Sequence, residues 1–133
     1  MHGEFLDTNV VIYSLSHDEQ KQDQALNLLS KKPVVSVQVL SESANIMRRK
    51  LGFDGSAIRA VVNRIGQACS NVQPLTLETL NLGLNIVDRY GFSHYDSLII
   101  AAALQADCDT LYSEDMQHGQ TIDGRLVIIN PFL

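Results

Sequence analysis

The chain has 133 residues, of which 45% are hydrophobic and 19% charged, and its net charge is −5 at pH 7. This size and balance are typical of a single globular domain, residues 1–133, and exclude a disordered protein. The negative charge argues against a broad basic surface for nucleic acid, although bound metal ions could supply positive charge locally.

No segment has the pattern of a membrane span or a signal peptide. The longest apolar run, residues 98–104, is too short to cross a bilayer, and the first residues lack a basic segment followed by an apolar one. We therefore expect a cytoplasmic protein in which Cys69 and Cys108 stay reduced. A functional Cys–His pair is the less favoured alternative, because such cysteines are usually small buried hydrophobic residues.

Short apolar segments alternate with helical patterns in the first half of the chain. The sequence predicts a strand at 4–6, a helical turn or two at 10–15, and a helix that follows HDEQKQDQ and ends at Pro33. A second strand is predicted at 34–35, with Ser36 as the N-cap of a helix over VQVLSESANIMRRK.

The second half repeats this alternation. Further helices are predicted from Asp54 to Cys69, from Leu77 to Tyr90, and over HYDSLIIAAALQA after the cap Ser93; further strands are predicted within 71–76, at 110–113 and at 126–130. Strands that alternate with helices predict an α/β fold, with a mostly parallel sheet covered by helices on both faces.

Four acidic residues lie where such a fold gathers its functional groups, at the carboxyl ends of the strands. Asp7 follows the first strand, and Asp115 follows a later strand after one intervening residue. Asp96 lies in the first turn of its helix, and Glu42 lies roughly 9 Å along the helix that follows the second strand. Four separate segments could therefore bring four carboxylates to one edge of the sheet.

Each carboxylate also has a purely structural interpretation. Asp7 could cap the helix that follows it, and Asp96 could form a capping box with Ser93. Asp115 could be a turn residue and Glu42 a solvated helix residue. These interpretations leave two facts unexplained: Asp7 lies between two apolar runs, and Asp96 begins a helix that is apolar on every side.

Carboxylates gathered at one edge would raise one another's pKa and destabilise the fold unless a cation bound them. Oxygen-only ligands favour Mg²⁺ or Mn²⁺ over zinc. One or two such ions can activate water and stabilise the oxygens of an in-line phosphodiester displacement. Thr8, Asn9 and Ser113 are residues of the right kind, in the right places, to orient the ligands.

The sequence resembles the PIN-domain nucleases, and more narrowly the VapC-type toxins of bacterial toxin–antitoxin systems, in FLDTNVVIY, VLSESANIMRRK, SHYDSLIIAAALQADCDTLYSEDMQHG and VIINPF. The resemblance implies a three-layer α/β/α sandwich and an endoribonuclease that uses Mg²⁺ or Mn²⁺ to hydrolyse RNA. It also implies a cognate antitoxin as partner, and a homodimer. It implies that the catalytic metal ligands are Asp7, Glu42, Asp96 and Asp115. It also implies that these ligands are supported by Thr8, Asn9 and Ser113.

The sequence departs from the family pattern after the fourth acid. Many members carry a second aspartate two residues later, often followed by an aromatic residue, whereas this chain has Gln117 and His118. The fourth position therefore offers one carboxylate, and the number of ions, one or two, stays open. His118 and His94 are each either a surface or turn residue or an acid–base group or ligand, and His118 is also a candidate contact for RNA or a partner.

A basic cluster, Arg48, Arg49 and Lys50, ends the helix that carries Glu42. These side chains either complement the carboxyl end of the helix or contact RNA phosphates or an acidic partner.

Three other function classes fit the pattern less well. A signalling receiver needs an early acidic pair and a late lysine, and no lysine follows Lys50. A phosphatase with an aspartyl nucleophile needs a second aspartate where Asn9 stands. A non-catalytic interaction module with the PIN fold is the alternative to a nuclease.

Overall fold

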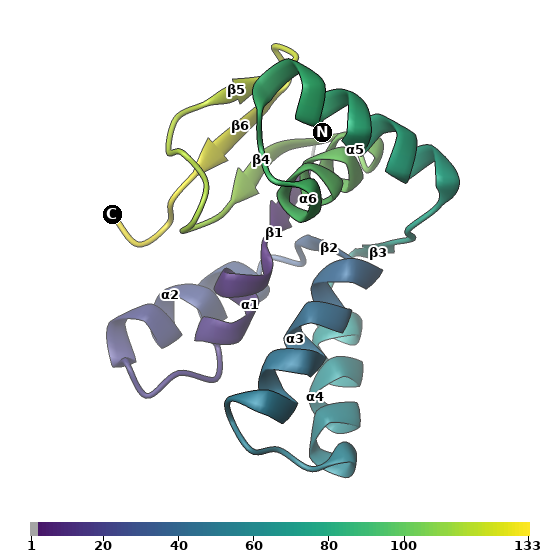
Figure 1. Ribbon diagram of the computed structural model, residues 1–133. Helices are drawn as coiled ribbons and strands as arrows, with labels where there is room; N and C mark the ends of the chain where they lie inside the picture. The colour runs from purple at the N-terminus through teal and green to yellow at the C-terminus, as the bar shows by residue number, and fades with distance from the viewer. Residues whose placement is uncertain (1–2) are drawn as a thin grey trace.

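A six-stranded sheet runs through the middle of the molecule in the computed structural model, which describes residues 3–133 (Figure 1). Its strand order is β3-β2-β1-β4-β6-β5. All neighbouring strands in it are parallel except β5, which runs antiparallel to β6. The strands are β1 (Gly3–Leu6), β2 (Val34–Ser36), β3 (Asn71–Gln73), β4 (Cys108–Tyr112), β5 (Thr121–Ile122) and β6 (Leu126–Ile129).

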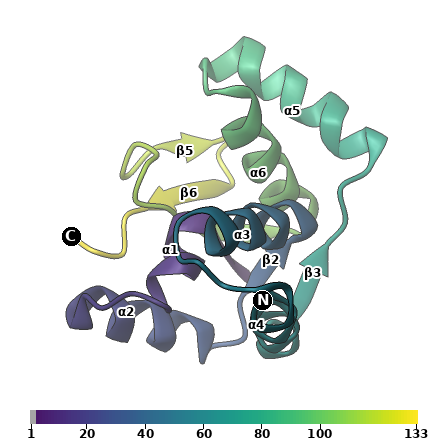
Figure 2. The same cartoon turned by 60° about the horizontal axis from the view of Figure 1, so that its bottom comes forward.

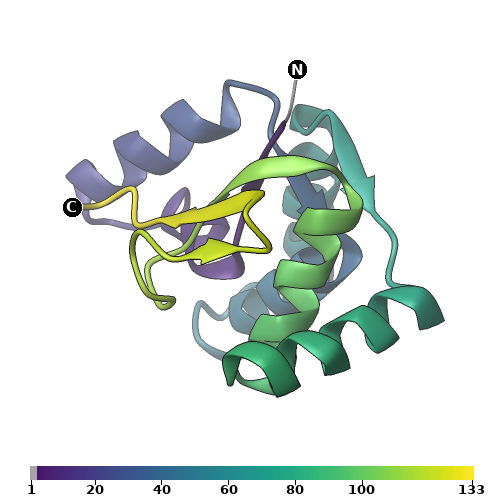
Figure 3. The same cartoon turned by 90° about the horizontal axis from the view of Figure 1, so that it is seen from above.

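Helices cover both faces of this sheet. Figure 2 shows α5 on one side of the sheet and α2 and α4 on the other, and Figure 3 shows α6 beside α5 and the β5–β6 pair at the side of the sheet away from β3. The α/β fold with a mostly parallel sheet is confirmed. The helices are α1 (Thr8–Tyr13), α2 (Glu19–Leu29), α3 (Val37–Arg49), α4 (Gly55–Ala68), α5 (Leu77–Tyr90) and α6 (His94–Gln105).

The strand order creates a switch point between β1 and β4. From β1 the chain moves outward through β2 to β3, and from β4 it moves the opposite way to β6. Crossovers of one hand therefore place α1 to α4 on one face of the sheet and α5 and α6 on the other. At such a switch point the loops that leave the two central strands diverge, which opens a crevice at their carboxyl ends.

The core is densest where α6 lies against the sheet. Every residue from Ser97 to Leu104 is buried, because α6 is covered by α5 on its outer side. Gly83 permits this close approach, since a Cβ at this position of α5 would lie 2.8 Å from Leu98 Cδ2. Phe5 and Leu6 of β1 are fully buried, so the segment that leads into Asp7 is anchored from within.

Most predicted elements are present, with shifted ends. The helix predicted over 77–90 is α5, which Gly91 ends in the left-handed conformation at φ 76°. The predicted first helix begins at Thr8 rather than Val10, because Asp7 caps it. The helix predicted to end at Pro33 ends at Leu29. The short strand β5 was not predicted, since two residues carry almost no periodicity.

The two cysteines are free thiols, with Cys108 buried and Cys69 half-buried. Burial raises the pKa of Cys69 to about 11 and that of Cys108 to about 12, so both are protonated at neutral pH and are poor nucleophiles. Within residues 3–133, none of the helices has both the length and the apolar character needed to cross a membrane.

Candidate active site

Asp7 lies at the switch point, directly after β1. Its backbone N–H donates to Tyr112 O at 2.9 Å, which extends the pairing with β4 by one residue. Only 4% of Asp7 is exposed. Its Oδ1 accepts from the N–H of Thr8 at 2.7 Å, and its Oδ2 accepts from Ser113 Oγ at 2.8 Å. Asp7 is thus both the cap of α1 and a buried carboxylate held by two segments.

Burial raises the pKa of Asp7 to about 6, and the charges of Asp96 and Glu42 add to this rise. The hydrogen bonds from Ser113 and Thr8 act in the opposite direction and offset only part of it. The ionised form of Asp7 is therefore unfavourable in this site, as expected for a carboxylate that lacks a positive partner.

Glu42 reaches the same edge because α3 leans across it. Thr8 Oγ1 donates to Glu42 Oε1 at 2.6 Å, and Gln38, one turn earlier on α3, donates from Nε2 to Glu42 Oε2 at 2.9 Å. The same Gln38 Nε2 lies 3.1 Å from the backbone oxygen of Tyr95 on α6. Gln38 is buried, and it ties the helix that carries Glu42 to the helix that carries Asp96.

Asp115 is joined to the first carboxylate by Asn9. Asn9 Nδ2 donates to Asp115 Oδ2 at 3.0 Å and lies 3.3 Å from Asp7 Oδ2, while Asn9 Oδ1 accepts from the N–H of Glu114 at 3.1 Å. The side chain of Asp115 is exposed, so one amide fixes a solvent-facing carboxylate beside a buried one.

Ser113 shapes the turn that carries Asp115. Its side chain is fully buried, and its Oγ donates to Asp7 while accepting from the N–H of Met116 at 3.2 Å. A hydroxyl can do both, which is why a serine suits a position between a carboxylate and a backbone donor.

Asp96 completes the set from the first turn of α6. Its backbone N–H donates to Ser93 Oγ at 3.2 Å, as expected of a capped helix. Its side chain is half-buried. Burial raises the pKa of Asp96, and the negative charges of Asp115 and Glu42 contribute further. The amino end of α6 favours negative charge here and opposes this repulsion in part.

The four carboxylates have the donor chemistry of a Mg²⁺ or Mn²⁺ site. All their ligand atoms are oxygens, and no Lys or Arg among residues 3–133 forms an ion pair with any of them. As the described side chains lie, no three His, Cys, Asp or Glu residues surround one point as ligands would. The oxygens of Asp7, Glu42 and Asp115 instead accept hydrogen bonds from neutral donors, namely Thr8, Asn9, Ser113 and Gln38.

Two features of the site were not predicted. Gln38 could have been found from its i, i+4 spacing to Glu42 on one helix face. The second feature is a network in which Lys21 Nζ donates to Glu114 Oε2 at 2.7 Å and to the hydroxyl of Tyr13 at 3.0 Å, while that hydroxyl donates to Glu114 Oε1. No local signal could have revealed this network, because its members are distant in the sequence.

Within residues 3–133, no hydrogen bond or ion pair joins the basic cluster or His118 to the four carboxylates. Arg48 and Arg49 occupy the last turn of α3 and Lys50 caps it, all three exposed. Nδ1 of His118 accepts from the N–H of Asn130 at 3.0 Å, which joins the turn at His118 to the residue that follows β6.

Comparison with known proteins places this geometry in a family. The model of the PIN domain matches residues 5–121. VapC20 of Mycobacterium tuberculosis, described as a sarcin–ricin loop cleaving toxin, is 18% identical over 84% of this chain and 89% of that chain, with a TM-score of 0.67. None of the curated proteins matches the chain.

Two further solved structures are similar as well. The FitAcB structure from Neisseria gonorrhoeae is 18% identical, with a TM-score of 0.68, and the match covers 97% of this chain and 98% of that chain. A toxin–antitoxin complex from Klebsiella pneumoniae is also 18% identical, with a TM-score of 0.68, and the match covers 96% of this chain and 97% of that chain. These structures share the fold, and the family model spans most of the chain: the protein belongs to the PIN domain family.

Proposed function

We propose that this protein is a metal-dependent endoribonuclease that hydrolyses RNA phosphodiester bonds. The observation that carries the proposal is the convergence of four carboxylates, from four segments, at the switch point of the sheet. One of them, Asp7, is buried with a pKa raised to about 6 and has no cationic side chain as partner among the described residues. A fold tolerates such a cluster when a cation is part of its working state.

One or two Mg²⁺ or Mn²⁺ ions would be held by Asp7, Glu42, Asp96 and Asp115. Such an ion supplies a Lewis acid that lowers the pKa of water and neutralises phosphate charge. The chain's own contribution is orientation: Ser113 holds Asp7, Thr8 holds Glu42, and Asn9 holds Asp115.

The reaction is an in-line displacement at phosphorus. The oxygen of a water molecule forms the new bond, the bond to the 3′-oxygen breaks, and the proton lost by the water balances the one that the 3′-oxygen gains. The products are a 3′-hydroxyl and a 5′-phosphate. Asp115 is exposed and Glu42 and Asp96 are half-buried, so an RNA strand can reach these carboxylates from solvent.

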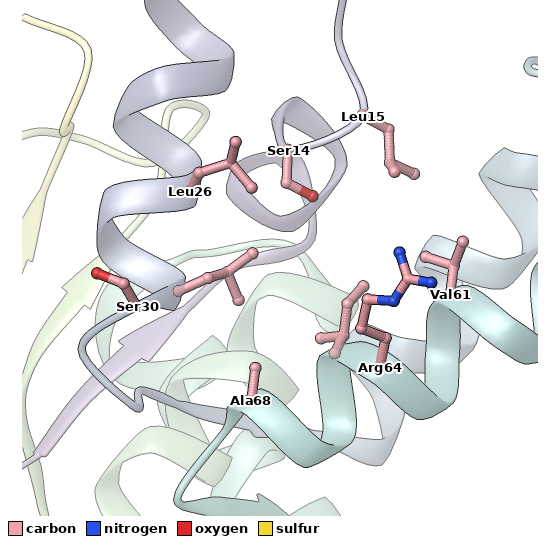
Figure 4. Close-up of a pocket in the computed structure, with 9 residues that line it drawn as sticks. Ser14, Leu15, Leu26, Ser30, Val61, Arg64 and Ala68 are labelled. Atoms are coloured by element: carbon pink, nitrogen blue, oxygen red, sulfur yellow. The ribbon is translucent and has the colours of Figure 1, made fainter.

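We infer further that the enzyme is the toxin of a toxin–antitoxin pair, since one similar structure is described as a toxin and another as a toxin–antitoxin complex. A hollow of about 310 Å³ between α2 and α4 suits an apolar antitoxin segment. Figure 4 shows Leu15 and Leu26 projecting into it, with Val61 and Arg64 on the α4 side. The guanidinium of Arg64 would pair with an acidic group of that segment. The homodimer implied by the family resemblance is tested by light scattering.

The decisive experiment is incubation of the purified protein with a panel of transfer, ribosomal and messenger RNAs in Mg²⁺, Mn²⁺ or EDTA. We expect cleavage with either metal, none with EDTA, and products that carry 5′-phosphate. The alternative, a non-catalytic interaction module with the PIN fold, predicts no cleavage of any RNA and no change in melting temperature with metal.

A further inference from the structure

Tyr95 is the only exposed aromatic side chain among the four Phe and four Tyr of the chain, all of which lie in the described part. Its exposed fraction is 65%. The other seven are buried or half-buried. An isolated exposed apolar residue needs no explanation, but Tyr95 occupies the position next to Asp96, at the rim of the candidate active site.

The backbone of Tyr95 is held by the site itself. Its carbonyl oxygen accepts from Gln38 Nε2 at 3.1 Å, and the same nitrogen lies 2.9 Å from Glu42 Oε2. Tyr95 is the second residue of α6, a helix buried for most of its length. The backbone that carries the ring is therefore rigid. Gln38 links it to the carboxylate of Glu42, and Asp96 is the next residue in the chain.

The ring is also oriented from the side. His94 packs edge-on against Tyr95, with 5.0 Å between ring centroids and 80° between ring planes. Edge-to-face packing limits rotation of the tyrosine while leaving most of its surface open. A rigid, exposed aromatic surface is the structure on which unpaired nucleobases stack.

Charge leaves few other means of holding RNA at this site. The net charge is −5, and the basic cluster begins six residues after Glu42, roughly 9 Å farther along the helix axis. Contacts between cations and phosphates give most proteins their general affinity for nucleic acid. Stacking contributes affinity without charge, because every base has an aromatic face.

We propose that Tyr95 is a stacking platform for an unpaired nucleobase adjacent to the phosphodiester that is cleaved. This inference rests on the proposed ribonuclease function and adds a substrate requirement to it: the RNA must be single-stranded and must present a base, not only a backbone, beside the scissile bond. Tyr95 thereby positions the strand relative to the four carboxylates.

The first test measures binding of a fluorescent pool of random 12-nucleotide RNA by anisotropy, in the Asp7→Asn background so that the probe stays intact. We expect Tyr95→Ala to weaken binding about 10-fold, Tyr95→Leu to weaken it nearly as much, and Tyr95→Phe to change it less than twofold. Leu77→Ala, a truncation of a residue that is 73% exposed on α5, is the control and should have no effect. Equal binding by all variants overturns the proposal.

The second test uses an RNA that the wild-type protein cleaves, with the base removed from one nucleotide at a time around the cut. One abasic position should lower kcat/KM about 10-fold for the wild type and have little further effect on Tyr95→Ala, because ring and base act as a pair. Independent, additive losses overturn the proposal.

The outcomes separate this inference from the function on which it rests. If the wild type cleaves no RNA, the proposed function fails, and the binding test still decides the role of Tyr95. If Tyr95→Ala leaves RNA binding and cleavage unchanged but weakens binding to a protein partner, the ring belongs to a protein interface and the stacking proposal is wrong.

Discussion

The amide of Asn9 joins the first and fourth carboxylates of the site, with Nδ2 3.0 Å from Asp115 Oδ2 and 3.3 Å from Asp7 Oδ2. Its oxygen accepts from the N–H of Glu114, so all the polar atoms of one side chain are used within the site. We expect Asn9→Ala to weaken Mn²⁺ binding about 10-fold or more, measured by calorimetry, because Asp115 would lose its orientation. Asn81→Ala, at an exposed position of α5, is the matched control.

Removal of either acid at the centre of the site should abolish RNA cleavage without unfolding the protein. Asp7→Ala and Asp96→Ala each delete a carboxylate from a crowded cluster, which relieves repulsion as well as removing a ligand. Cleavage of RNA and the melting temperature measure the two effects separately. Asp88→Ala, on the exposed face of α5, should cleave normally. Wild-type cleavage by both site variants would falsify the catalytic assignment.

The buried Asp7 predicts a dependence of stability on pH in EDTA. Its pKa is about 6 in the fold against 3.8 for an ordinary aspartate, so the folded state holds the proton more tightly. Asp7 then costs almost nothing well below pH 3.8, and its penalty grows between pH 3.8 and pH 6 and levels off above pH 6. The whole loss of unfolding free energy is about 3 kcal/mol, most of it between pH 4 and pH 7.

Urea denaturation at a series of pH values measures this effect. The difference between the wild type and Asp7→Asn should change across that interval, because asparagine does not ionise. Asp96, whose pKa is also raised, contributes in the same direction in both proteins. A difference that does not vary with pH would show that Asp7 titrates normally.

Divalent ions should stabilise the protein by binding only to the folded state. At an ion concentration 100 times the dissociation constant, the gain is about 2.7 kcal/mol, or a rise in melting temperature of about 5–10 °C for a chain of this size. Mg²⁺ and Mn²⁺ should both raise the melting temperature of the wild type, and neither should raise that of Asp7→Asn appreciably. No shift at millimolar metal would favour the non-catalytic alternative.

The hollow between α2 and α4 predicts a partner contact that is separate from catalysis. Leu26 is 48% exposed and lines this hollow, so Leu26→Glu should weaken binding of a co-expressed antitoxin at least 10-fold while RNA cleavage stays unchanged. Leu84→Glu places the same charge at a leucine that is 46% exposed on α5 and should bind normally. Equal antitoxin binding by both variants would show that the hollow is not part of the interface.

The sequence by itself determined most of the secondary structure and the identity of the acids. Periodicity predicted α3, α4, α5 and α6 nearly residue for residue, and three of their starts could be read from Ser36, Asp54 and Ser93, because such residues act on their own first turns. The cap of α5, Thr76, was not predicted. Alternation of strands and helices predicted the parallel sheet, since a helix between two strands carries the chain back so that the second strand runs in the same direction as the first. The acids after strand ends could be selected because strand ends share one edge.

Only the tertiary structure decided how those acids are held. Glu42 contacts Thr8 across 34 positions of sequence, and Asn9 contacts Asp115 across 106, distances at which no local pattern carries information. The same is true of Gln38, which hydrogen-bonds to residues of both α3 and α6. It is also true of Tyr95, whose exposure depends on which other elements pack around it. Local propensity is set by neighbours in the chain, whereas burial and orientation are set by neighbours in space, and in this protein FLDTNVVIY becomes a site only when α3, α6 and the turn after β4 surround it.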